Sequence, residues 1–325
     1  MTFPHLAGRA ERLARELDLS PPAAQWVALA ALHAGCFLRS QYCAYSGHSR
    51  EAARLLVQQL IERRFAAETP CGELGRACRL TSKAIYHALG AAELRHHRRA
   101  RLPVLYRRLL SLDYVLERPD LPWLGTAAEK LACFDKLGVP RLLLPRRVYR
   151  GAAGGAVRYF VNQHLIAVDA AARSAVFVYV DSEEQTHKGL RSWRRDRGAL
   201  WRRLYDLGFR LSIVHAGRHR KLSRNVQTLF QHWARIPRSR QDINELSAEL
   251  GRLEEALEKN DKAVLDEYGG FSRALSYAGE LEGRLEHKNE IVGYEASYEV
   301  WLSQRLRPKT GERRRRRSRW DDLGA

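Results

Sequence analysis

The sequence has no apolar run that approaches the roughly 20 residues needed for a membrane-spanning helix. Its opening stretch, MTFPHLAGRAERLARELDLS, is amphipathic and polar, and it lacks the apolar core of a signal peptide. Cysteine is scarce and odd in number, at five in 325 residues, which is typical of a reducing compartment. These absences predict a folded, cytoplasmic protein.

The few cysteines are spaced too widely for a common zinc site. Six residues separate Cys36 from Cys43, and six separate Cys71 from Cys78, with two histidines nearby. Zinc knuckles usually place roughly two to four residues between paired ligands. We therefore expect small buried core cysteines and no resident metal, with zinc ligation by these four as the alternative.

Acidic residues are also in short supply, since 56 Lys and Arg stand against 37 Asp and Glu, for a net charge of +19. The excess covers residues 1–235, at +20, and the tail 309–325, at +4, whereas residues 236–308 carry −5. Such a field attracts polyanions, of which nucleic acid is the commonest in the cytoplasm. An acidic protein partner is the alternative reading of the same charge.

Residues 40–80 follow a helix-turn-helix pattern that ends in two short strands. A short helix fits 40–45, and Gly47 can take the positive φ of a tight turn. Ser49 is a good N-cap for a second helix over 49–63, on which Arg50, Arg54 and Gln58 share one face. Strands over 65–68 and 77–80 form a wing. The pattern predicts a winged helix-turn-helix that binds double-stranded DNA, with a module docked on a protein as the alternative.

Arginine is well suited to gripping phosphates and, like glutamine, to reading base edges in the major groove. A basic run at 95–101 and a later helix over 190–207 extend the set of candidates, although a solvated linker or face would explain each equally simply. The predicted DNA contacts are Ser49, Arg50, Arg54 and Gln58 on the second helix, Arg76 and Arg79 on the wing, Arg95, Arg98, Arg99 and Arg101 in the basic run, and Arg191, Arg194 and Arg195 on the later helix.

The middle of the chain reads as a mixed α/β layer. Thr126 and Glu129 form a capping box for a helix that ends near Gly138. Segments 147–150 and 156–161 flank a Gly-rich turn that is no phosphate loop, because no GK[ST] follows it. A second hairpin fits 164–169 and 174–181. A helix over 190–207 with six exposed arginines, a strand over 209–215 and a helix over 223–234 complete the layer.

The last quarter is polar and helical in pattern. Residues 238–260 and 276–304 read as two long helices, with leucines at three- and four-residue spacing and a bend near 268–271. This predicts an antiparallel helical arm that makes a homodimer or docks a protein partner through residues 238–304. The arginine-rich tail 309–325 is expected to be disordered when free.

Two parts of the sequence carry a family resemblance. Residues 49–64 with the wing, and then Leu165-Ile-Ala-Val-Asp169 and Phe177-Val-Tyr-Val-Asp181, resemble the replication-relaxation family of plasmids and mobile elements over about residues 20–235. The resemblance implies DNA binding linked to replication, transfer or regulation. It also implies a second unit similar to the PD-(D/E)xK, restriction-endonuclease-like fold, often without an intact site.

An active nuclease of that fold needs an Asp at one strand end and an acidic-x-Lys on the next strand, to hold Mg²⁺ and position water. Glu183 stands where the lysine is needed, and Lys188 lies too far along the chain. The nearby histidines have no Ser or Cys nucleophile in a recognisable constellation. We therefore expect no cleavage and no cofactor. A Mg²⁺-dependent endonuclease is the alternative, with Asp169, Asp181, Glu183 and Lys188 as its catalytic residues.

Together the patterns predict an α+β protein in four parts. Residues 1–95 form a winged-helix DNA-binding domain, 96–237 an α/β nuclease-like domain with a mixed sheet, 238–308 a helical hairpin or coiled-coil arm, and 309–325 a basic tail. The leading functional hypothesis is a nucleoid-associated DNA-binding protein of a mobile element or plasmid. A scaffold subunit of a nucleoprotein complex is a further alternative.

Overall fold

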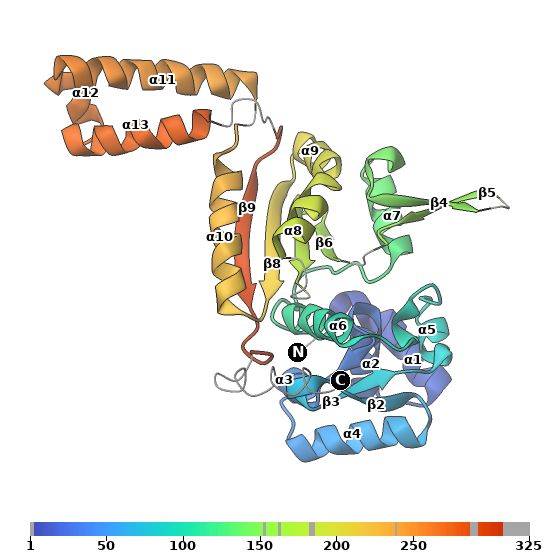
Figure 1. Ribbon diagram of the computed structural model, residues 1–325. Coiled ribbons are helices and arrows are strands. Elements are labelled where there is room, and N and C mark those ends of the chain that lie inside the picture. The colour runs from blue at the N-terminus through green and yellow to red at the C-terminus, as the bar shows by residue number, and fades with distance from the viewer. Residues whose placement is uncertain are drawn as a thin grey trace, which may run out of the picture.

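The computed structural model describes residues 3–151, 154–161, 164–181, 186–237, 239–286 and 292–307. It is a mixed α and β structure with several sheets, which confirms the predicted α+β class (Figure 1). A helical body with a small sheet lies at the bottom of Figure 1, a four-stranded sheet with its helices lies above it, and a helical arm projects at the top. No helix in these ranges is long and apolar enough to cross a membrane.

The N-terminal body is built around α2, which is buried along almost its whole length. The Trp26 ring contacts the rings of Phe37, Tyr42 and Tyr45 at centroid distances of 5.2, 5.5 and 5.0 Å. The small sheet is antiparallel, in the order β1-β3-β2. The elements are α1 (Ala7–Leu17), α2 (Pro21–His33), β1 (Cys36–Phe37), α3 (Arg39–Ser46), α4 (Arg50–Glu62), β2 (Ala66–Pro70), β3 (Arg76–Leu80) and α5 (Lys83–Ala88).

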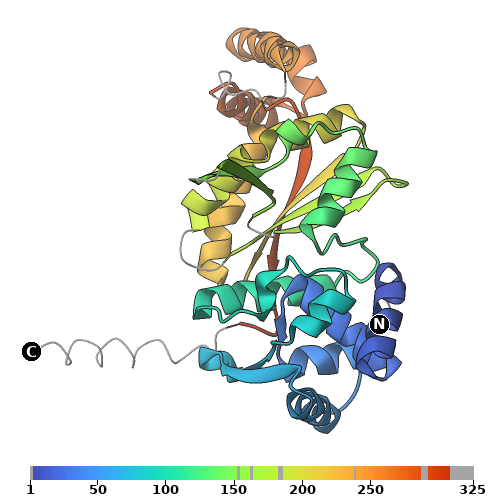
Figure 2. The same ribbon diagram turned by 90° about the vertical axis from the view of Figure 1, so that its right-hand side faces the viewer.

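Helix α6 (Leu102–Leu116) joins the N-terminal body to the sheet above it, as Figure 2 shows. Leu109 and Leu112 of α6 are fully buried, and they belong to one hydrophobic cluster that also contains Trp26 below and Val178, Val214 and others from the sheet above. The predicted boundary at residue 95 therefore marks no break in the core.

The central sheet has the order β6-β7-β8-β9, with β6 antiparallel to β7 and the other neighbours parallel. The prediction of a single helix over 190–207 is wrong. One helix ends at Arg195, and a second begins at Gly198. The elements are α7 (Ala127–Lys136), the hairpin β4 (Arg146–Gly151) and β5 (Gly154–Tyr159), then β6 (Leu165–Asp169), β7 (Ser174–Val180), α8 (Thr186–Arg195), α9 (Gly198–Asp206), β8 (Arg210–Gly217), α10 (Arg220–Arg235) and β9 (Ala296–Leu302).

The arm consists of α11 (Arg240–Lys259), α12 (Lys262–Glu267) and α13 (Phe271–Leu285), which bury a small cluster of their own. The backbone N–H of Val292 donates to the carbonyl of Pro237 over 3.2 Å, so the chain leaves and re-enters the body at one point. The prediction of a helix over 276–304 is wrong beyond Leu285, where α13 ends. Residues 296–302 form a strand instead, because their partner β8 pairs with them in parallel along its whole length.

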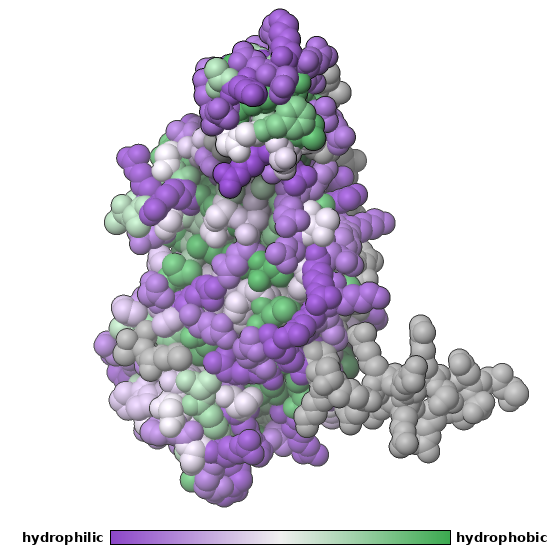
Figure 3. All heavy atoms as spheres, turned by 90° about the vertical axis from the view of Figure 1, so that its left-hand side faces the viewer, coloured by the Kyte–Doolittle hydropathy of each residue, from purple (hydrophilic) through white to green (hydrophobic). Residues whose placement is uncertain are grey.

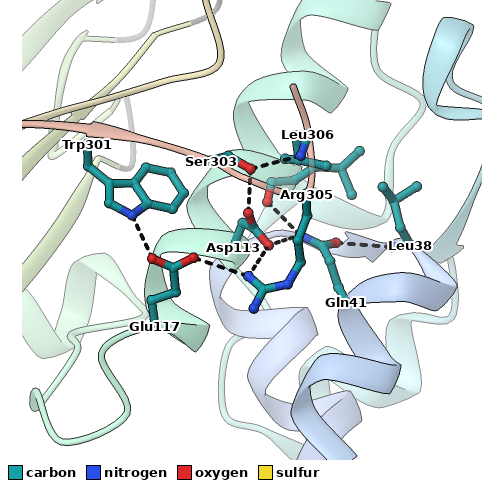
Figure 4. A network of polar contacts seen from close by, with 9 residues as sticks. Leu38, Gln41, Asp113, Glu117, Trp301, Ser303, Arg305 and Leu306 are labelled. Atoms are coloured by element: carbon teal, nitrogen blue, oxygen red, sulfur yellow. Dashed lines mark hydrogen bonds and ion pairs between the residues drawn. The ribbon is translucent and has the colours of Figure 1, made fainter. Parts of the chain in front are cut away.

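The segment after β9 is fastened to the N-terminal body by a buried polar network (Figure 4). The carboxylate of Asp113, on α6, accepts hydrogen bonds from Ser303 at 2.5 Å, Arg305 at 2.9 Å and Gln41 of α3 at 3.4 Å. Trp301 donates to Glu117 over 2.7 Å. The described chain thus ends beside α3, and the tail 309–325 lies outside the described residues.

Candidate nucleic-acid interface

Helices α3 and α4 meet at a tight turn, as the sequence predicts. Gly47 ends α3 in the left-handed conformation, with φ of 72°, and its N–H donates to the carbonyl of Cys43. Ser49 begins α4, where its hydroxyl accepts a hydrogen bond from the N–H of Ala52 over 3.3 Å. Both features follow from local chemistry, because glycine tolerates positive φ and serine satisfies a free helix N–H.

The exposed face of α4 carries the predicted side chains, but it is less positive than its arginines suggest. The guanidinium of Arg54 donates to Glu51 at 2.6 and 3.0 Å and to Gln58 at 3.0 Å, and Gln58 donates to Glu62 at 2.8 Å. This pairing raises the pKa of Arg54 and lowers the pKa of Glu51. Since all these side chains are exposed, the pairing is weak and a phosphate can compete for Arg54.

The β2–β3 hairpin presents one of its two predicted contacts to solvent. Arg76 is 72% exposed and lies 3.1 Å from Glu68, which also pairs with Arg39 at 2.7 Å. Arg79 is half-buried and donates to the backbone carbonyl of His97 over 2.7 Å. Arg76 is therefore available to a ligand, whereas Arg79 braces the segment that follows α5.

That segment, η3 (Arg95–His97), forms one wall of a cleft of about 800 Å³ between the N-terminal body, α6 and the β4–β5 hairpin. It packs closely on Gly35, where a Cβ would overlap the side chain of His96. Nine basic side chains line the cleft against one carboxylate, Glu93. The nine are Arg95, Arg98, Arg107, Arg108, Arg158, His33, His96, His97 and His164.

The cleft contains two of the four predicted contacts in the basic run. Arg95 and Arg98 line it, while Arg99 and Arg101 are exposed outside its lining. Sequence reasoning missed Arg107, Arg108 and Arg158, because they come from α6 and β5 and meet the basic run only in the folded chain. The adjacent pair Arg107-Arg108 was the one local signal.

The arginines of α8 and α9 do not form the predicted exposed row of six. Arg191 and Arg195 are exposed, but Arg194 is half-buried and stacks on the ring of Trp233 at 4.6 Å. Arg197 is only 5% exposed, and burial lowers its pKa to about 10. Arg202 donates twice to the carbonyl of Val292. Several of these side chains therefore stabilise the fold, and the patch left for a ligand is small.

The candidate nuclease residues do not assemble. Asp169 pairs with Ser174 at one end of β7, whereas Asp181 follows the other end, so roughly 20 Å of strand separates the two carboxylates. Lys188 is exposed on α8, and Glu183 lies outside the described residues. One Mg²⁺ ion cannot bind both aspartates, which contradicts the alternative in which they share a metal.

Each aspartate has a structural partner instead. Asp169 accepts a hydrogen bond from the N–H of Ala172 over 2.8 Å and so shapes the β6–β7 turn. Asp181 is 2% exposed and lies 3.2 Å from Nε2 of the fully buried His215. These contacts match the simpler reading of the sequence, in which Asp169 begins a turn and Asp181 ends a strand.

No group of three or more His, Cys, Asp or Glu side chains within the described ranges could hold a metal ion. Cys36, Cys71 and Cys78 are buried and Cys43 is half-buried, as expected of core cysteines. Burial raises the pKa of the Cys36 thiol to about 12 and that of Cys71 to about 11. The chain matches no known protein-family model, no curated protein and no solved structure.

Proposed function

We propose that this chain binds double-stranded DNA through α3, α4 and the β2–β3 hairpin. The observation that carries the proposal is the placement of α4. It is the outermost element of the N-terminal body in Figure 1, it is held on α3 across the Gly47 turn, and it turns Arg50, Arg54 and Gln58 to solvent. An exposed polar helix supported in this way is the element that helix-turn-helix proteins insert into the major groove.

The order of elements supports the same proposal. A helix, a short strand, two helices and a two-stranded hairpin follow one another from α2 to β3, which is the order of a winged helix-turn-helix. Arg76 extends from the hairpin beside α4, where it could contact the phosphate backbone. The residues that resemble the replication-relaxation family favour a role of this binding in the replication, transfer or regulation of a mobile element.

Variants of α4 test the proposal. Replacing both Arg50 and Arg54 with Ala should weaken duplex binding by roughly ten-fold or more and flatten the salt dependence, because two phosphate or base contacts are lost. Arg12→Ala on α1, which is also exposed, is the control for loss of positive charge. Fluorescence anisotropy across a series of salt concentrations measures both the duplex affinity and its salt dependence. Equal losses in the α4 and α1 variants would reject α4 as the DNA-binding element.

The arm supports a second candidate function, as a docking device in a nucleoprotein assembly. Residues 239–286 contain 12 acidic and 6 basic side chains, a net charge of −6, in contrast to the basic body. Phe271 and Leu275, one turn apart on α13, are 50% and 56% exposed. Figure 3 shows hydrophobic atoms gathered on one side of the otherwise hydrophilic arm. An acidic arm with an exposed apolar pair suits a basic protein partner better than DNA.

A further inference from the structure

The inner wall of the cleft contains two buried histidines, each with one ring nitrogen that has no hydrogen-bond partner in the described part of the chain. His33, on α2, is 6% exposed, and His164, just before β6, is 8% exposed. Both line the cleft. Among the described residues, neither Nε2 of His33 nor Nδ1 of His164 has a hydrogen-bond partner. A buried polar atom without a partner is costly, so two at one wall indicate a missing ligand.

A buried lysine lies close to both histidines. Lys130, on α7, is 2% exposed, and its ammonium donates to the backbone carbonyl of His164 over 3.0 Å. It is close enough to lower the pKa of both His33 and His164, although burial lowers them more. Burial, with help from Arg197, lowers the pKa of Lys130 itself to about 8. A buried ammonium therefore lies next to the part of the wall that His164 forms.

The nearest carboxylate is committed elsewhere. Glu129 pairs with Arg9 and accepts hydrogen bonds from the N–H groups of Gly125 and Thr126, as the capping box requires. It caps α7, and it raises the pKa of Lys130 by less than burial and Arg197 lower it. An entering anion would give Lys130 a counter-charge and would accept hydrogen bonds from the neutral rings of His33 and His164.

The outer part of the cleft offers a surface for a flat ring. Tyr149 of β4 is 39% exposed, and the guanidinium of Arg158 lies 5.5 Å from its ring centre. Both line the cleft. Aromatic rings and arginine planes stack on nucleic-acid bases with little preference for sequence. The cleft thus places a stacking surface outside a buried cationic wall.

The geometry points to a binding site for a terminal phosphate of a nucleotide or of a nucleic-acid strand, with the phosphate against His33 and His164, near the buried Lys130, and the base against Tyr149 and Arg158. This deepens the proposed function, since it adds a site for strand ends to one for duplex DNA. A phosphate monoester fits better than an internal diester because it carries more charge and more free oxygens toward a closed wall.

Inorganic phosphate, a nucleoside 5′-monophosphate and a short single strand with either a 5′-phosphate or a 5′-hydroxyl end are the probes. Binding to the full-length protein is measured by calorimetry and anisotropy. We expect inorganic phosphate to bind, and the 5′-phosphate strand to bind about ten-fold more tightly than the 5′-hydroxyl strand. A monophosphate that competes fully with the strand would identify free nucleotide as the source, and partial competition would identify the strand end.

Two variants locate the site. Lys130→Met removes the buried charge, and His164→Phe keeps a ring against Tyr179 but removes the donor. Each should lose about ten-fold or more in phosphate affinity. Lys136→Met, on the same helix but exposed, is the matched control and should change affinity less than two-fold or so. The comparison of 5′-phosphate with 5′-hydroxyl strands uses the unaltered protein, so its result does not depend on whether a variant folds.

Equal binding of both strand ends, or equal losses in the Lys130 and Lys136 variants, would overturn the site. Covalently closed duplex DNA has no ends, so it separates this inference from the proposed function. If closed duplex binds but the 5′-phosphate and 5′-hydroxyl strands bind equally, only the proposed phosphate site is rejected. If the 5′-phosphate strand binds more tightly but closed duplex does not bind, only the proposal for α4 is rejected.

Discussion

The hydroxyl of Ser303 donates a hydrogen bond to the carboxylate of Asp113 over 2.5 Å, across a sequence separation of 190 residues. Asp113 lies on α6, which packs against the N-terminal body, and Ser303 directly follows β9, the last strand of the central sheet. Burial raises the pKa of Asp113, and Ser303, Arg305 and Gln41 oppose that rise. This network closes the chain onto its first half.

Asp113→Ala should lower the free energy of unfolding by about 2–4 kcal/mol, because it removes the acceptor of the buried Ser303 hydroxyl and one acceptor each from Arg305 and Gln41. Urea denaturation followed by circular dichroism measures the loss. Asp135→Ala, which removes an exposed carboxylate paired with Arg141, is the control and should leave the midpoint nearly unchanged. Similar midpoints for the two variants would mean that the network does not hold the chain together.

Glu51→Gln should strengthen duplex DNA binding several-fold at low salt. The change removes the carboxylate that now pairs with Arg54 and the negative charge that repels phosphate. Stability should hardly change, because the pair is exposed. Fluorescence anisotropy on the same duplex measures whether the affinity rises or falls, with Glu11→Gln on α1 as the control. Unchanged or weaker binding in Glu51→Gln would place α4 away from the DNA.

Lys130→Met should stabilise the protein at neutral pH. The folded pKa of Lys130, about 8, lies below the ordinary value of 10.5, so folding opposes its protonation. The unfolded chain binds more protons between these values, and stability therefore rises with pH between about 8 and 10.5. Below pH 8 the full cost, of the order of 3 kcal/mol, is present in the unaltered protein.

The gain from Lys130→Met should accordingly be largest below pH 8 and shrink toward pH 10.5. Thermal unfolding at a series of pH values measures it, with the exposed Lys136→Met as the reference. The charged groups that face Lys130 are Arg197, Glu129, His33 and His164. A gain that does not depend on pH would show that packing, and not the buried charge, is responsible.

Replacing residues 238–291 with a short Gly-Ser linker should leave the body folded and still able to bind DNA. Pro237 and Val292 are hydrogen-bonded neighbours, and the arm has a separate hydrophobic cluster. Self-association or partner binding should disappear, and light scattering with pull-down of a basic partner would detect the loss. Deleting everything from 238 onward should instead unfold the body, because that also removes β9 and Ser303. Loss of folding in the linker variant would contradict this division.

Local chemistry made much of the fold predictable. The Ser49 cap, the Gly47 turn and the Thr126–Glu129 capping box are all present, because each depends on residues within a few positions of one another. The strands at 165–169 and 174–180 are also present, since their apolar runs are short and the turn between them is tight.

Long-range pairing explains what the sequence could not predict. Residues 296–302 lie at the end of the segment predicted as a helix over 276–304, and they become a strand because β8, some eighty positions earlier, offers a free edge. The cleft likewise needs α2, α6, α7 and the β4–β5 hairpin together, so His33, Lys130 and His164 gave no common signal in one dimension. The alternative Mg²⁺ site failed for a local reason instead, because β6 and β7 form an antiparallel hairpin that places Asp169 and Asp181 at opposite ends of β7.

Selection from a random pool of duplex DNA tests the central claim most directly. The full-length protein and the Arg50→Ala/Arg54→Ala variant are each incubated with the pool, and the retained DNA is sequenced. If α4 reads DNA, the unaltered protein enriches a discrete motif and the variant loses it while still retaining some DNA through the basic body. Retention of the same sequences by both proteins, or of none by either, would contradict the account.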